Sequence, residues 1–246
     1  IFRVPQAHAV INRLGFNNYG VDQLLENVEK SDYQGILGIN IGKNFDTPLE
    51  QAIDDYLICL RKVYNRASYI TVNISSPNTK NLRQLQDAEA FDHLLRDLKI
   101  EHELLADKYG KYTPLVVKIA PDLVSSQIES MATLLIKHKI DGVIATNTTI
   151  SRKGITQFPV SKENGGLSGA PLTQQATQVI NELHHFLQNE IPIIGVGGIM
   201  SATNAQEKMD AGASLLQIYT GLIYRGPDLV GEIARVICAN MRPDKQ

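Results

Sequence analysis

Short apolar runs rich in Val and Ile alternate along the chain with longer segments whose apolar residues recur at helical spacing. The short runs are typical of buried strands, and the longer segments are typical of amphipathic helices. Strands are predicted at residues 36–41, 69–74, 115–119, 142–146, 192–196 and 214–218. Helices are predicted at residues 21–31, 48–66, 88–109, 125–138, 171–188, 202–211 and 227–241. Apolar strands separated by helices indicate a parallel sheet with both faces covered.

Polar or small residues close each predicted strand, and no Gly-x-Gly-x-x-Gly follows an early one. A doubly wound sheet gathers its ligand groups at one switch point, whereas a (β/α)8 TIM barrel uses the carboxyl ends of all its strands. The pattern therefore favours an α/β fold of the TIM-barrel type with about six βα units present. Since a barrel needs eight strands, either two are hidden in residues 1–18 or the first two units are absent from this chain. No linker interrupts residues 1–246, so we expect a single domain.

Composition excludes several classes of function. The chain has 246 residues, 43% of them apolar and 20% charged, with a formal net charge of -2. Because the basic residues are dispersed, nucleic-acid binding is not expected. The two cysteines, Cys59 and Cys238, lie in helical patterns, and the histidines lack metal-ligand spacing, so we expect free thiols and no metal site. No apolar run approaches the roughly 20 residues that span a bilayer, so this chain alone is expected to be soluble.

The segment 73–78, Asn-Ile-Ser-Ser-Pro-Asn, carries the densest group of polar side chains at a strand end. Ser76 in this position would ordinarily cap the following turn or helix. No Gly-x-Ser-x-Gly elbow surrounds it, so an acyl-transfer role has no support. If Ser76 takes part in chemistry, we expect it to remove a proton.

Five carboxamides lie at or near predicted strand ends: Asn12, Asn40, Asn73, Asn78 and Asn147. Each offers both a donor and an acceptor, which suits a planar ligand with alternating N–H and C=O groups, such as a pyrimidine. Any one of them alone is more simply explained as a turn cap. Convergence of the five would favour the ligand.

Lys118 lies inside the apolar run 115–119, where an unpaired ammonium is costly, so we expect an anionic partner. The partner is either an acidic residue of the barrel or a ligand, such as an anion or an electron-rich cofactor ring. The glycines of segment 195–198 and the sequence Tyr219-Thr220-Gly221 end the last two predicted strands, where barrels commonly hold a phosphate. The simpler alternative is that these glycines only permit tight turns.

Six segments, in order along the chain, resemble the class 2, quinone-linked dihydroorotate dehydrogenases: 12–18, 38–44, 73–79, 145–149, 165–169 and 194–199. The resemblance implies an FMN-dependent barrel that oxidises dihydroorotate to orotate in pyrimidine biosynthesis. In that family a base removes a proton from C5 while a hydride leaves C6 for flavin N5. The base is serine in class 2 and cysteine in class 1, and Ser76 occupies its position.

The resemblance also implies roles for individual residues. Ser76 would act with Thr79 and water as a proton relay, shielded by Phe16. Substrate would contact Asn12, Arg13, Leu14, Gly15, Phe16, Asn73, Asn78, Asn147 and Thr148. FMN would contact Asn40, Asn73, Lys118, Thr146, Gly169, Gly198, Tyr219 and Thr220, with Lys118 stabilising the negative charge of the reduced ring.

Two departures from the family pattern change the expectations. Lys80-Asn81 replaces the usual Pro-Gly in the loop after the base, which concerns closure of the lid. The region before residue 12 lacks the family's membrane-touching helices, quinone tunnel and first two strands. The full-length enzyme would lie peripherally on the cytoplasmic side of the inner or cell membrane and pass electrons to quinone. This chain alone would bind FMN weakly, fail to reduce quinone and tend to associate.

Two alternative functions remain at this point. One is another FMN barrel oxidoreductase that acts on pyrimidines, such as a dihydropyrimidine dehydrogenase domain. The chain lacks the cysteines that such a domain needs for iron–sulfur clusters. The other alternative is a catalytically silent barrel fragment.

Overall fold

A computed structural model describes residues 1–240 and places six strands in one parallel sheet. In spatial order these are β3 (Gly38–Ile41), β4 (Tyr69–Asn73), β5 (Leu115–Ile119), β6 (Gly142–Ala145), β8 (Ile193–Val196) and β9 (Leu215–Gln217). All six coincide with predicted strands, and neighbours in the sheet follow the chain order. The prediction of successive βα units is therefore confirmed.

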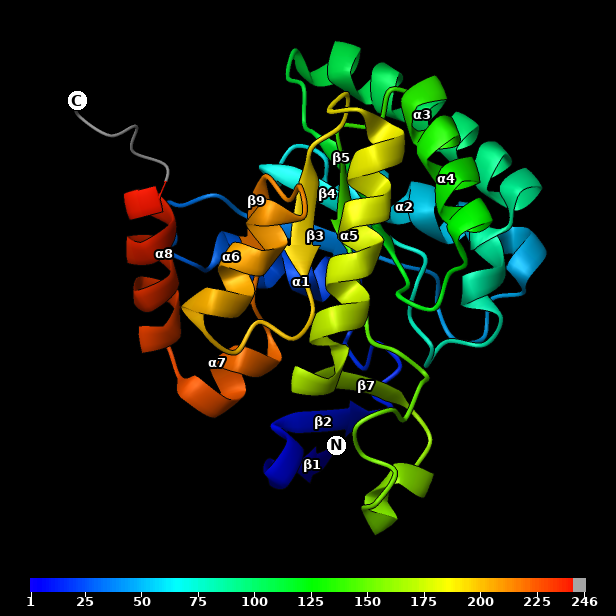
Figure 1. Ribbon diagram of the computed structural model, residues 1–246. Coiled ribbons are helices and arrows are strands. Elements are labelled where there is room, and N and C mark those ends of the chain that lie inside the picture. The colour runs from blue at the N-terminus through cyan, green and yellow to red at the C-terminus, as the bar shows by residue number, and fades with distance from the viewer. Residues whose placement is uncertain (241–246) are drawn as a thin grey trace.

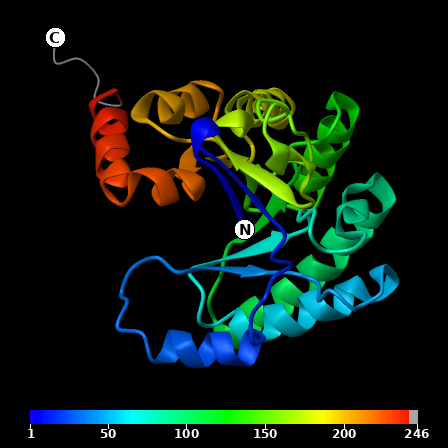
Figure 2. The ribbon, with the colours of Figure 1, turned by 90° about the horizontal axis from the view of Figure 1, so that it is seen from below.

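Helices connect these strands and cover the outer face of the sheet. They are α1 (Val21–Glu29), α2 (Ala52–Val63), α3 (Ala88–Tyr109), α4 (Ser125–Lys137), α5 (Thr173–Leu187), α6 (Ala202–Asp210), α7 (Thr220–Arg225) and α8 (Asp228–Asn240). Figure 2 shows them as an arc around the strands that leaves one side open. The sequence pattern missed α7, because its six residues are too few to show a helical period. The predicted end of the last helix at residue 241 falls outside the described residues.

Residues 1–18 do contain two strands, but they are not barrel strands. β1 (Phe2–Val4) pairs antiparallel with β2 (Ala9–Asn12), which pairs antiparallel with β7 (Gly166–Gly169). This small sheet lies across the carboxyl ends of the parallel strands, at the lower side of Figure 1. The idea that residues 1–18 hide two missing barrel strands is therefore wrong, because β2 pairs with β7 in the long loop after β6 and β1 pairs with β2.

Side chains on the two faces of the parallel sheet meet different surroundings. Outward residues such as Val72, Val117 and Val143 are fully buried in the main core against the helices. Inward residues Val116 and Ile144 form a smaller apolar cluster with Val196. Within the described residues β3 and β9 each pair on one side only, so the six strands form a curled partial barrel.

None of the helices in residues 1–240 combines the length and apolar character needed to cross a bilayer.

Candidate active site

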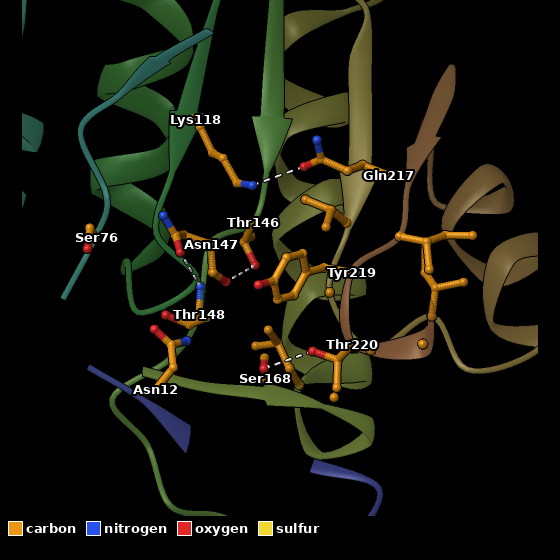
Figure 3. Close-up of a pocket in the computed structure, with 18 of the residues that line it drawn as sticks. Asn12, Ser76, Lys118, Thr146, Asn147, Thr148, Ser168, Gln217, Tyr219 and Thr220 are labelled. Carbon is orange, nitrogen blue, oxygen red and sulfur yellow. Dashed lines mark hydrogen bonds between the residues drawn. The ribbon is translucent and has the colours of Figure 1, made fainter. Parts of the chain in front are cut away.

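A cavity of about 350 Å³ lies at the carboxyl ends of the strands, between the parallel sheet and the small β2–β7 sheet (Figure 3). Strand ends and following loops from β4 to β9 all contribute to its wall, as the sequence pattern predicted. The polar and small lining residues are Asn12, Gly15, Asn73, Ser76, Asn78, Lys118, Thr146, Asn147, Thr148, Ser168, Gly169, Gly197, Gly198, Gln217, Tyr219, Thr220 and Gly221. Phe16 adds an aromatic ring to the wall.

One side of the cavity, which we call the amide wall, consists of Asn12, Asn73, Asn78 and Asn147. Asn78 Nδ2 donates to Asn12 Oδ1 at 3.1 Å, and Asn147 Nδ2 donates to Asn73 Oδ1 at 3.2 Å. Asn147 Nδ2 also donates to Ser75 Oγ at 3.0 Å. The amides therefore orient one another in two pairs, and four of the five predicted carboxamides converge on one cavity.

Ser76 caps a turn and also lines the cavity. Its Oγ accepts a hydrogen bond from the Asn78 backbone N at 3.2 Å, which is the contact of a residue that caps a turn. Its side chain is 7% exposed and also lines the cavity beside Asn78. Thr79 is buried, and its Oγ1 has no partner among the described residues, but Thr79 does not line the cavity.

Lys118 Nζ donates to Gln217 Oε1 at 3.0 Å, and the two side chains reach toward each other in Figure 3. No carboxylate in the described chain forms an ion pair with Lys118, so the alternative of an acidic barrel partner is wrong. Burial lowers the pKa of Lys118 from 10.5 to about 8, because an ammonium loses hydration inside the sheet. Such a cation can still gain an anionic ligand as its partner.

Gln217 was missed by the sequence analysis, although a signal for it existed. It is a polar residue near the end of the apolar run 214–218, as Lys118 is in the run 115–119. Both side chains point to the inner face of the sheet, since both line the cavity.

The opposite side of the cavity, which we call the glycine wall, consists of Gly169, Gly197, Gly198, Tyr219 and Thr220. Gly198 has a φ of +71°, and a Cβ there would lie 2.5 Å from both N and Cα of Thr173. Thr173 Oγ1 donates to Gly198 O at 2.8 Å and fixes this loop against the start of α5. Thr220 Oγ1 donates to Ser168 Oγ at 2.9 Å, and Ser168 is a second lining residue that the sequence analysis did not select.

Besides Thr79, three of the predicted site residues lie away from the cavity. Arg13 forms an ion pair with Glu163 at 2.7 Å, and Leu14 is 41% exposed. Asn40 lines a second cavity of about 700 Å³, which shares Gly15 and Phe16 with the first. The structure therefore does not bring Asn40 together with the other amides.

The wall of the first cavity offers a ligand an unpaired hydroxyl, bare backbone and a cation. Thr148 Oγ1 is buried without a protein partner, so it is available to a ligand. At Gly169, Gly197 and Gly198 the glycine wall presents backbone without side chains, so the N–H groups there are accessible to a phosphate. Lys118 supplies a cation with no competing carboxylate, as noted above.

Polar groups at the carboxyl ends of a curled parallel sheet define an α/β barrel protein with one composite ligand site. A family model described as dihydroorotate dehydrogenase matches residues 1–241, so the chain belongs to the dihydroorotate dehydrogenase family. The chain is 66% identical to dihydroorotate dehydrogenase (quinone) of Nitrosospira multiformis, over 97% of this chain and 68% of that protein. It is 64% identical to the protein of the same name from Nitrosomonas europaea, over 97% of this chain and 70% of that one.

Solved structures agree with this assignment. The crystal structure of DHODH in complex with ferulenol from Eimeria tenella superposes with a TM-score of 0.90 at 34% identity. The match covers 97% of this chain and 69% of that one. The fold and the family are therefore established independently of the predicted site residues.

Proposed function

We propose that this chain is an FMN-dependent oxidoreductase domain that oxidises dihydroorotate to orotate in pyrimidine biosynthesis. The observation that carries the proposal is the single cavity that joins Ser76, the amide wall, Lys118 and the glycine wall. The names of the relatives support the substrate, and the donors and the cation that line the cavity support the cofactor. We also propose that residues 1–246 form one functional domain.

FMN would lie between Lys118 and the glycine wall. Backbone groups of Gly169 and Gly198, with Tyr219 and Thr220, would hold its phosphate end, because unshielded N–H groups favour an anion. Thr146 and Asn73 would contact the ring. When bound, FMN supplies an acceptor for the hydride from C6 of dihydroorotate. Lys118 would place its positive charge beside the ring, where reduction adds negative charge.

Dihydroorotate would lie against the amide wall and Thr148. Paired carboxamides present donors and acceptors in fixed directions, which matches the alternating groups of a dihydropyrimidine. Ser76 would remove the proton from C5, and Thr79 with water would pass it on, since an unperturbed hydroxyl is a weak base by itself. Phe16 would exclude bulk water from this side.

Quinone would accept the electrons in the next half-reaction. The relatives are named as quinone-linked enzymes, and this chain spans 68% and 70% of the first two. We propose that segments of the relatives beyond the matched part contribute contacts to quinone and to the membrane surface.

The test is anaerobic titration of the FMN-reconstituted chain with dihydroorotate, followed by the flavin absorbance. Dihydroorotate should bleach the flavin stoichiometrically, whereas dihydrouracil should not. Bleaching by dihydrouracil alone would identify a different pyrimidine oxidoreductase. If the chain binds FMN and neither compound bleaches the flavin, the chain is catalytically silent and the proposed function is wrong.

A further inference from the structure

Arg83 lies outside the cavity, and the proposed chemistry leaves it without a role. It belongs to the short 3-10 helix Leu82–Gln86 that follows the Ser76 loop. Its side chain is 21% exposed, and that of its ion-pair partner Asp122 is 16% exposed. A charge pair withdrawn from water to this extent is costly unless its hydrogen bonds are satisfied.

The three guanidinium nitrogens of Arg83 each reach a different loop. Nε donates to Ser75 O at 3.0 Å, in the loop after β4. Nη2 donates to Thr148 O at 2.7 Å, in the loop after β6. Nη1 donates to Asp122 Oδ2 at 2.8 Å, in the loop after β5. The carbonyl of Ser75 belongs to the peptide unit that carries the nitrogen of Ser76.

Asp122 extends these contacts on the far side of Arg83. Its carboxylate accepts hydrogen bonds from Thr149 Oγ1, from Ile150 N at 3.2 Å and from Gln175 Nε2 at 3.3 Å. On the cavity side, the Asn147 amide already bonds to Asn73 and Ser75. The loops after β4 and β6 are therefore tied together both at the cavity surface and behind it.

We infer that Arg83 is a positioning residue that sets the distance between Ser76 and the substrate-holding loop of Asn147 and Thr148. The inference rests on the proposed function, because it assigns Arg83 to the geometry of that reaction. A planar guanidinium directs donors to three separate acceptors, whereas the donors of a lysine ammonium leave from one point. Displacement of a reacting group by about 1 Å lowers a rate by about 100-fold.

Hydrogen exchange tests the positioning without any flavin. Arg83→Gln removes the charge, and Arg83→Lys keeps an ion pair with Asp122, which preserves the fold if the Gln variant is unstable. Amides in residues 73–82 and 146–151 should exchange about fivefold faster or more in both variants. Arg61→Gln is the matched control, because Arg61 also pairs with a carboxylate, Glu101, at 2.9 and 2.7 Å, but between α2 and α3. Wild-type exchange rates in both Arg83 variants would overturn the inference.

Half-reaction kinetics separate the two proposals. In both Arg83 variants, flavin reduction by dihydroorotate should slow by about 30- to 100-fold, while flavin content stays at the wild-type value. If the wild-type flavin is bleached and the variants bleach equally fast, the inference fails and the proposed function stands. If dihydroorotate does not bleach the wild-type flavin, the proposed function fails. In that case the hydrogen-exchange rates of the Arg83 variants alone test whether Arg83 holds the loops after β4 and β6 together.

Discussion

The two walls of the cavity recognise ligands in different ways. The amide wall uses side chains from β2 and from the loops after β4 and β6, and these side chains are hydrogen bonded to one another. The glycine wall uses backbone from the ends of β7 and β8, where close packing excludes side chains, together with Tyr219 and Thr220 after β9. Side-chain amides select a ligand by its pattern of donors and acceptors, whereas bare backbone accepts a negatively charged group of suitable size. The comparison assigns substrate selectivity to the first wall and cofactor retention to the second.

The largest expected effect is that of Ser76→Ala, which should slow flavin reduction without weakening ligand binding at the amide wall. Ser76→Ala removes the only group proposed to take the C5 proton, so flavin reduction by dihydroorotate should fall by about 1,000-fold. Orotate affinity should change little, because the four amides remain. Stopped-flow absorbance under anaerobic conditions measures the first quantity, and an orotate titration measures the second. A variant that reduces its flavin at the wild-type rate would remove Ser76 from the mechanism.

The next effect tests the glycine wall. Gly198→Ala introduces a Cβ against the Thr173 backbone at a φ of +71°, so the loop must shift. The variant should lose about 3 kcal/mol of unfolding free energy and release FMN. Gly110→Ala is the control, because Gly110 has a φ of +57° in the left-handed helical region but no atom within 4 Å of the added Cβ. It should lose only about 1 kcal/mol and retain FMN. Urea unfolding measures the free energy of unfolding, and the flavin content after gel filtration measures the retained FMN. Equal losses of stability and of FMN in the two variants would refute the packing argument.

The smallest effect concerns Lys118, which lies between the walls. Its pKa in the folded chain is about 8 against an ordinary value of 10.5, so the unfolded chain binds more protons between these values. The flavin-free chain should therefore gain stability as pH rises from about 8 toward 10.5. Below pH 8 the full cost of burying the charged Lys118 ammonium lowers the stability of the fold. Lys118→Met should raise the midpoint of thermal unfolding at pH 7 by about 2–4 °C and weaken FMN binding.

Lys208 provides the internal reference for this pH dependence. It is fully buried, and burial lowers its pKa to about 8 as well, but it lies outside the cavity. The pH dependence of Lys118→Met should therefore be reduced and not abolished. Thermal melts at pH 7 and pH 9, with and without FMN, measure the pH dependence of stability and the stabilisation by FMN. An unchanged FMN affinity in Lys118→Met would place the ring away from this lysine.

The sequence by itself determined the six parallel strands, most of the helices and the amide groups at the strand ends. Helix α3 and strand β5 begin and end at the predicted residues, because apolar periodicity is a local property of the chain. Ser76, Lys118 and the glycines were found because polar residues are rare at the ends of apolar strands. Their assignment to catalysis and to FMN remains a prediction.

Only the tertiary structure decided which of these groups meet. It placed β2 against β7, separated Asn40 from the other amides, and paired Lys118 with Gln217 instead of an acidic residue. It also brought Arg83 to carbonyls on two loops that are distant in the sequence. The physical reason is that local periodicity fixes which face a residue takes, whereas contacts between strand ends depend on how far the sheet curls and on how the long loops pack across it.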